Sequence, residues 1–114
     1  MAFERAASLS DLEEGVGVPV RVEGHPICLV RRGDEVVAIY DVCSHQDYPL
    51  HEGFVFGSSI ECALHGSTFD LETGAAENLP ATRPVPIFAV KRDGNEVFVD
   101  IGQRLNDAPI PEHY

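Results

Sequence analysis

A chain of 114 residues has the length of a single domain, and its 44% hydrophobic and 24% charged residues are typical of a globular protein. Eight Lys and Arg stand against 19 Asp and Glu, giving a formal net charge of -11. This charge argues against binding to nucleic acid or to an anionic membrane surface. No apolar run approaches the ~20 residues of a membrane span, and no secretory signal is visible, so we expect a cytoplasmic protein.

The first forty residues predict short strands. A Ser-Asp start followed by Glu-Glu indicates at most one helical turn over residues 9–14. Period-two alternation then predicts a strand over 18–22. Apolar runs over 26–30 and 35–40 flank a turn-forming cluster at 31–34, which predicts a hairpin.

The C-terminal part repeats this pattern. Residues 85–91 and 96–101 flank an Asp-Gly pair that tolerates the positive φ of a tight hairpin turn. The tail over 102–114 contains two prolines and is expected to lie extended and loosely packed on the surface. Short strands separated by Gly and Pro predict an antiparallel all-β fold.

The middle of the chain, residues 41–74, has weak periodicity and contains most of the Cys and His. It holds two clusters in matched order: Cys43-Ser44-His45, and Cys62-Ala63-Leu64-His65 sixteen residues later. Any one of these residues could be an ordinary core or surface group. Four together indicate a metal centre, because thiolate and imidazole are common metal ligands.

Two metal centres use two thiolates and two imidazoles. A tetrahedral zinc site is one, although zinc fingers usually bring a Cys pair from one loop and a His pair from a helix. A Rieske centre is the other: two Cys hold one iron and two His hold the second, so each loop contributes to both irons. One Cys and one His on each loop favour the diiron arrangement.

The two clusters resemble the Rieske motif, Cys-x-His followed by Cys-x-x-His-Gly. Residues after the second cluster also look like that family: Ser67, Phe69, Asp70, Thr73 and Gly74. Size and flanking strands resemble the Rieske-type ferredoxins of bacterial ring-hydroxylating dioxygenases. The resemblance implies one Rieske domain over 1–114, an antiparallel β-sandwich or barrel base with a cluster-binding subdomain at about 42–74.

For the ligands, the resemblance implies one 2Fe-2S cluster, with Cys43 and Cys62 on one iron and His45 and His65 on the outer iron. For the function, it implies a one-electron carrier that transforms no organic substrate in aromatic hydrocarbon catabolism. The carrier would take electrons from a flavin-dependent NAD(P)H ferredoxin reductase and pass them, through transient contacts, to a terminal oxygenase. A small subunit of an assimilatory nitrite reductase and a zinc-stabilised binding module remain as alternatives.

Departures from the high-potential Rieske proteins are informative. Those proteins carry two further cysteines, which form a disulfide that braces the loops; Tyr48 and Leu64 stand at the matching positions here. Packing of Pro49, Leu50, Leu64 and Phe69 is therefore expected to hold the loops. Phe69 also replaces a Tyr whose hydroxyl bonds a ligating sulfur, and fewer such donors lower the reduction potential.

The remaining Cys and His are expected to have no part in the cluster. Cys28, inside a predicted strand, is expected to be a buried inert thiol. His51 is expected to be a solvated loop residue, and His25 and His113 to be surface residues.

The resemblance also indicates a docking rim. We expect His45 and His65 to form the electron port, with Tyr48, Pro49 and His51 beside it. Acidic residues close to the loops, Asp47 and Glu52, are expected to steer basic partner surfaces toward it.

Overall fold

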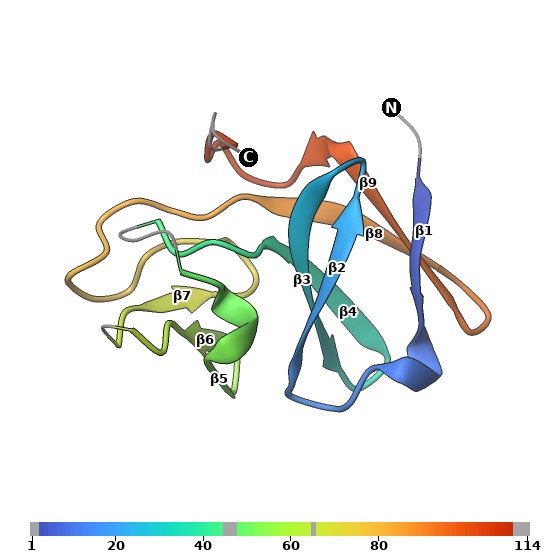
Figure 1. The fold of residues 1–114 in the computed structure, drawn as a ribbon, viewed down its shortest axis with the longest axis horizontal. Coiled ribbons are helices and arrows are strands. Elements are labelled where there is room, and N and C mark those ends of the chain that lie inside the picture. The colour runs from blue at the N-terminus through green and yellow to red at the C-terminus, as the bar shows by residue number, and fades with distance from the viewer. Residues whose placement is uncertain (1–2, 45–47, 65, 111–114) are drawn as a thin grey trace.

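The computed structural model describes residues 3–44, 48–64 and 66–110 (Figure 1). His45, Gln46, Asp47 and His65 lie outside the described residues, as do both ends of the chain. Two of the four predicted cluster ligands therefore have no structural account.

Two antiparallel sheets make up the described fold. In spatial order the larger sheet contains β1 (Glu4–Ser8), β9 (Glu96–Arg104), β8 (Ile87–Asp93), β4 (Glu35–Tyr40), β3 (His25–Arg32) and β2 (Gly17–Val22). Its two edge strands, β1 and β2, also contact each other, so the sheet curves into a nearly closed barrel. The predicted all-β fold is confirmed.

The smaller sheet consists of three-residue strands in the order β5 (Phe54–Phe56), β6 (Ser59–Glu61) and β7 (Thr68–Asp70). It lies to one side of the barrel in Figure 1. Two short 3-10 helices complete the regular structure of the described residues, η1 (Leu9–Asp11) and η2 (Leu50–Glu52). Among the described residues, no helix is long and apolar enough to cross a membrane.

The core runs from the barrel to the smaller sheet. Ile27, Leu29 and Val30 on β3 are fully buried, and η2 lies against both β2 and β3. In the smaller sheet, Ile60 and Phe69 are fully buried and belong to the same apolar cluster. The smaller sheet is thus packed on the barrel through one of its two faces.

Both predicted hairpins are present, with positive φ at Gly33 and Gly94 in their turns. The expected loose tail is wrong in part. Strand β9 continues to Arg104, Ala108 is fully buried, and the Arg104 guanidinium donates to the Ala108 carbonyl at 2.6 Å.

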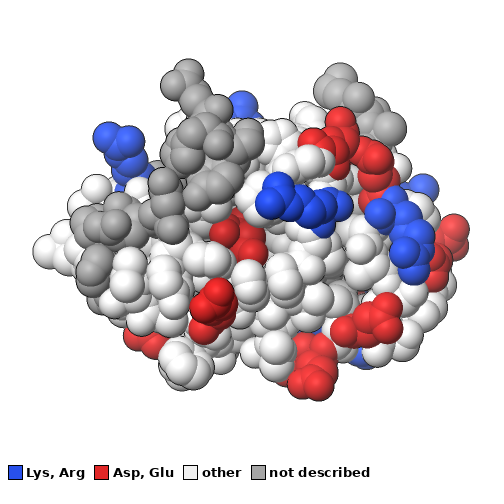
Figure 2. All heavy atoms as spheres, viewed as in Figure 1, with Lys and Arg blue, Asp and Glu red and all other residues white. Residues whose placement is uncertain are grey.

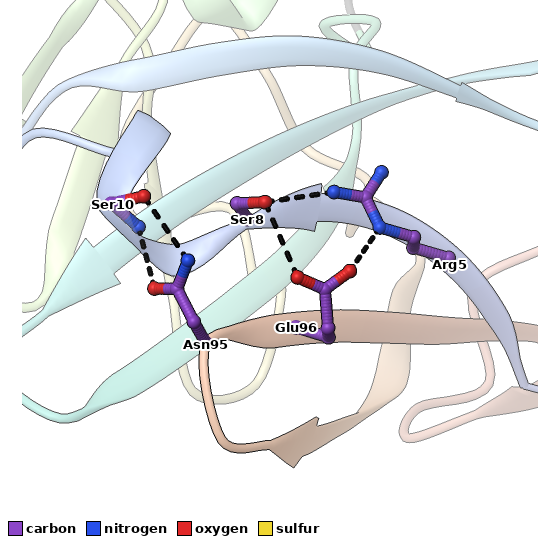
Figure 3. Close-up of polar contacts among 5 residues, drawn as sticks. All are labelled: Arg5, Ser8, Ser10, Asn95 and Glu96. Carbon is purple, nitrogen blue, oxygen red and sulfur yellow. Dashed lines mark hydrogen bonds and ion pairs between the residues drawn. The ribbon is translucent and has the colours of Figure 1, made fainter.

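Strand β1 was not predicted, and polar contacts attach it to the last hairpin (Figure 3). The guanidinium of Arg5 pairs with the Glu96 carboxylate and donates to the Ser8 hydroxyl at 2.7 Å. The Asn95 amide exchanges two hydrogen bonds of 3.1 Å with Ser10. These contacts fix the start of the chain far from the Cys loops.

Candidate metal centre

The first Cys cluster begins at Cys43, three residues after β4 ends at Tyr40. Cys43 is buried, and its backbone N–H donates to the Tyr48 carbonyl at 2.9 Å, which closes the loop over residues 43–48. The Ser44 hydroxyl donates to the Arg83 carbonyl at 2.6 Å, so the loop is also held to the segment before β8. This arrangement places a thiol at the inner end of a closed loop.

A carboxylate joins the two ends of a wider loop around this one. Asp41 is 5% exposed, and its two oxygens accept from the backbone N–H of His51 at 2.7 Å and from the His51 ring Nδ1 at 2.5 Å. The residue that follows β4 is thus tied to η2. We call this contact the Asp41–His51 clamp.

The clamp was not predicted from the sequence, and it corrects the expectation that His51 is solvated. His51 is half-buried and hydrogen-bonded rather than solvated. The reason is that η2 packs closely on β2: a Cβ placed on Gly17 would lie 3.1 Å from the His51 Cα. His25 is also partly buried, at 3.2 Å from the Tyr40 hydroxyl, rather than a surface residue.

The second Cys cluster follows β6. Cys62 is buried, its N–H donates to the Ser67 carbonyl at 2.7 Å, and the Gly66 N–H donates to the Cys62 carbonyl at 2.9 Å. Gly66 has φ +78°, which an L side chain rarely adopts. A tight loop of five residues therefore carries the second Cys.

The two loops converge. Gly53 ends the first loop so close to β6 that a Cβ there would collide with the Glu61 carbonyl, next to Cys62. Tyr48, in the first loop, lies within electrostatic reach of Cys62: its pKa is raised, mainly by the Glu52 carboxylate and in smaller part by Cys62. Cys43 and Cys62 also belong to one buried cluster.

Packing around the loops agrees with the sequence only in part. Leu50 and Phe69 are fully buried, as expected, and Pro49 is partly buried. The expected packing of Leu64 is wrong, because this side chain is 44% exposed. Ser67 is fully buried, and its hydroxyl oxygen accepts from the Ala81 N–H at 3.0 Å, which leaves its own proton to be donated elsewhere.

Cys28 is a different kind of thiol. It is fully buried on β3, and burial together with the Asp41 charge raises the pKa of its thiol well above the usual range. No disulfide joins the three cysteines. Cys28 is thus the buried structural thiol that the sequence predicted.

The two donor side chains that the structure describes, the thiols of Cys43 and Cys62, fit a metal centre. Two buried thiols lie on convergent loops in an apolar surround, where soft metal ions are bound by Cys. Among the described residues, no group of three or more His, Cys, Asp or Glu could hold a metal ion. Both predicted His ligands lie outside that part of the chain.

Comparison with known proteins identifies the class. The family model described as "Rieske [2Fe-2S] domain" matches residues 3–89, so the chain belongs to the Rieske [2Fe-2S] domain family. Its cofactor is a Rieske-type 2Fe-2S cluster. The sequence resemblance is confirmed.

Individual relatives within the Rieske family are ferredoxins of dioxygenase systems. The biphenyl 2,3-dioxygenase ferredoxin component of Rhodococcus jostii RHA1 is 38% identical over 89% of this chain and 94% of its own length. The carbazole 1,9a-dioxygenase ferredoxin of Nocardioides aromaticivorans IC177 has a TM-score of 0.81 and 41% identity, covering 87% of this chain and 97% of that one.

A third match is a complex of reduced oxygenase and oxidised ferredoxin in carbazole 1,9a-dioxygenase, with a TM-score of 0.81 and 34% identity over 90% of this chain and 94% of that one. These relatives are electron-transfer components of dioxygenase systems rather than the catalytic oxygenases. The prediction of an electron carrier that is not itself an enzyme is confirmed, and the nitrite reductase alternative is less supported.

Proposed function

We propose that this protein carries single electrons from a flavin-dependent NAD(P)H ferredoxin reductase to the terminal oxygenase of a ring-hydroxylating dioxygenase system. The observation that carries the proposal is the convergence of two loops, each of which follows a strand and carries a buried Cys, in a chain related to dioxygenase ferredoxins. When bound, the cluster supplies one reversible electron and no substrate chemistry.

The chain's own residues would hold and tune the cluster. Cys43 and Cys62 would bind the inner iron, and His45 and His65 the outer one. The buried Ser67 hydroxyl has a proton to donate toward the cluster sulfur. Phe69 fills the neighbouring core without a hydroxyl. With few donors, we expect a midpoint potential near the low end of the Rieske range, on the order of -150 mV.

The proposal also includes the domain organisation of the chain, its location in the cell and the way it meets its partners. The segment of about 42–74, with the smaller sheet, would be a cluster-binding subdomain inserted in a β base within one domain. The protein would work in the cytoplasm and meet its partners transiently. A net charge of -11 would steer it toward basic partner surfaces.

Electron transfer can be followed anaerobically with purified partners. The holoprotein is mixed with NADH and the reductase of the Rhodococcus jostii biphenyl system, and the cluster absorbance is recorded before and after that system's oxygenase is added. We expect bleaching with the reductase and recovery with the oxygenase. Purification as a tight complex with a large nitrite reductase subunit, without either response, would contradict the proposal.

A further inference from the structure

The outward face of the smaller sheet is built differently from its buried face. Antiparallel register places Phe54 opposite Glu61, and Glu61 opposite Thr68. It also places Phe56 opposite Ser59, and paired residues share a face of the sheet. Val55, Ile60 and Phe69 alternate with them and point toward the core. The outward face thus carries two phenylalanines.

These two rings are exposed to solvent and do not belong to the buried core of the described residues. Phe54 and Phe56 are 59% and 58% exposed, and their ring centroids lie 6.3 Å apart. They occupy β5, the edge strand of its sheet. Adjacent exposed aromatic residues are typical of protein interaction surfaces, where aromatic and Arg side chains contribute most of the binding energy.

The charges around the two rings are acidic, which favours a cationic partner. Glu61 and Asp70 lie on the same face by register, and Glu77 is bound to it by a 2.7 Å hydrogen bond from Ser59. Between positions 41 and 82 the sequence has seven Asp and Glu but no Lys or Arg. In Figure 2, acidic but no basic spheres are visible at the lower left, over the smaller sheet.

The face is also next to the second Cys loop. Glu61 directly precedes Cys62, and a Cβ placed on Gly66 would lie 3.5 Å from the Glu61 Oε2. The aromatic pair, the carboxylate and the loop are therefore continuous. A protein bound here would lie beside the Cys-bearing end of the metal centre.

We propose that this face, defined by Phe54, Phe56 and Glu61, docks the cationic surface of a redox partner through its Lys or Arg side chains; this rests on the proposed function. A guanidinium can stack on an aromatic ring while it pairs with a carboxylate. A second copy of the chain does not fit, because a two-fold contact would set the same carboxylates against each other. An anionic membrane is repelled for the same reason.

Stopped-flow oxidation of the dithionite-reduced holoprotein tests the proposal, with the cationic redox protein cytochrome c as the probe. The double variant Phe54→Ser/Phe56→Ser should lower the second-order rate constant about ten-fold at low salt. Glu61→Gln should lower it several-fold at low salt and little at high salt. The control Leu105→Ser, another exposed apolar residue, should stay within two-fold of wild type.

The midpoint potential of each variant is measured so that a change in driving force is recognised. Rates within two-fold of wild type for both the aromatic variant and Glu61→Gln, at unchanged potential, would overturn the docking face and leave the electron carrier intact. A wild-type dimer that the aromatic variant dissociates would overturn it too, in favour of a second copy. A wild-type cluster that cannot be reduced and reoxidised would contradict the proposed function itself.

Discussion

The three cysteines are all buried, yet their surroundings differ. Cys43 lies three residues after β4 and Cys62 directly after β6, and each begins a closed loop, whereas Cys28 lies inside β3. The pKa of the Cys28 thiol is raised by burial and by the Asp41 charge, which keeps it protonated and poor as a ligand. Position in the fold thus separates a structural thiol from two candidate ligands.

This difference predicts the effect of removing each side chain. Cys28→Ala should leave two iron and two sulfide per chain, because the thiol contributes packing alone. Cys43→Ala and His65→Ala should each abolish or cripple the cluster. Iron and acid-labile sulfide analysis of the purified variants checks this, and full iron content in His65→Ala would defeat the ligand assignment.

The Asp41–His51 clamp makes a second prediction. Asp41→Ala leaves the partly buried backbone N–H of His51 without its acceptor, which costs at most about 1–3 kcal/mol. The free energy of unfolding should fall by up to that amount, and iron should be lost faster. Asp41→Asn, which keeps an acceptor for the N–H, is the matched control and should lose less. Equal losses in both variants would mean that the carboxylate does not act through this hydrogen bond.

At the scale of elements, the sequence predicted those features that depend on residues close together in the chain, such as tight turns. Gly33 and Gly94 provide the positive φ of tight turns, so both hairpins were predicted, with strand ends that differ from the structure by up to three residues. Strands β5, β6 and β7 were missed because three residues are too few to show an alternation. The four ligand candidates were visible as a motif, but the clamp was not, since Asp41 and His51 meet only after η2 packs on β2.

Gly53 has its own prediction, because it joins η2 to the smaller sheet. Its φ of -89° suits any residue, so the constraint is the approach of the Glu61 carbonyl. Gly53→Ala should push η2 away from β6 and lower both thermal stability and iron content. Gly57→Ala, in the β5–β6 turn, meets nothing within 4 Å but has φ +54°, so it measures the cost of backbone strain without a collision and should keep its iron content. Full cluster content in Gly53→Ala would contradict this close contact.

The attachment of β1 predicts a pH dependence. The hydrogen bond from Arg5 is the main cause that lowers the pKa of Glu96 below its usual 4.5. A carboxylate with a lowered folded-state pKa stabilises the fold above its unfolded pKa and loses this effect as the pH falls. The thermal stability of wild type should exceed that of Glu96→Gln at pH 7, and the gap should close as the pH falls below about 4.5. A gap that stays constant from pH 7 to 3.5 would contradict the pairing.

At the scale of the whole molecule, charge is unevenly distributed along the chain. Positions 41–82, which contain both Cys loops, have no Lys or Arg, while seven of the eight lie in the barrel strands and the eighth, Arg83, lies just before β8. Composition predicted the electrostatic steering, but only the register of the smaller sheet places acidic residues beside two exposed rings. The sequence could not predict that face, because the exposure of Phe54 and Phe56 depends on which side of the sheet meets the core.

The charge predicts a salt dependence of electron transfer. Steering acts over a Debye length of about 10 Å at 0.1 M salt, and over less in stronger salt. The rate of reduction by the reductase should therefore fall as ionic strength rises, through association rather than the transfer step. Glu52→Lys, near the first loop, should slow association, whereas Asp93→Lys, at the far hairpin, should have little effect. Flat rates across a salt series with Glu52→Lys silent would mean that the acidic surface does not steer.

The central claim is that Cys43, His45, Cys62 and His65 hold a Rieske-type cluster that carries one electron. The most direct measurement is the EPR spectrum of the purified, dithionite-reduced protein, together with its iron and sulfide content. We predict a brown protein with two iron and two sulfide per chain, and a reduced signal of low average g value, because imidazole on one iron makes the two irons unequal. A colourless protein that contains zinc and no acid-labile sulfide would contradict the account.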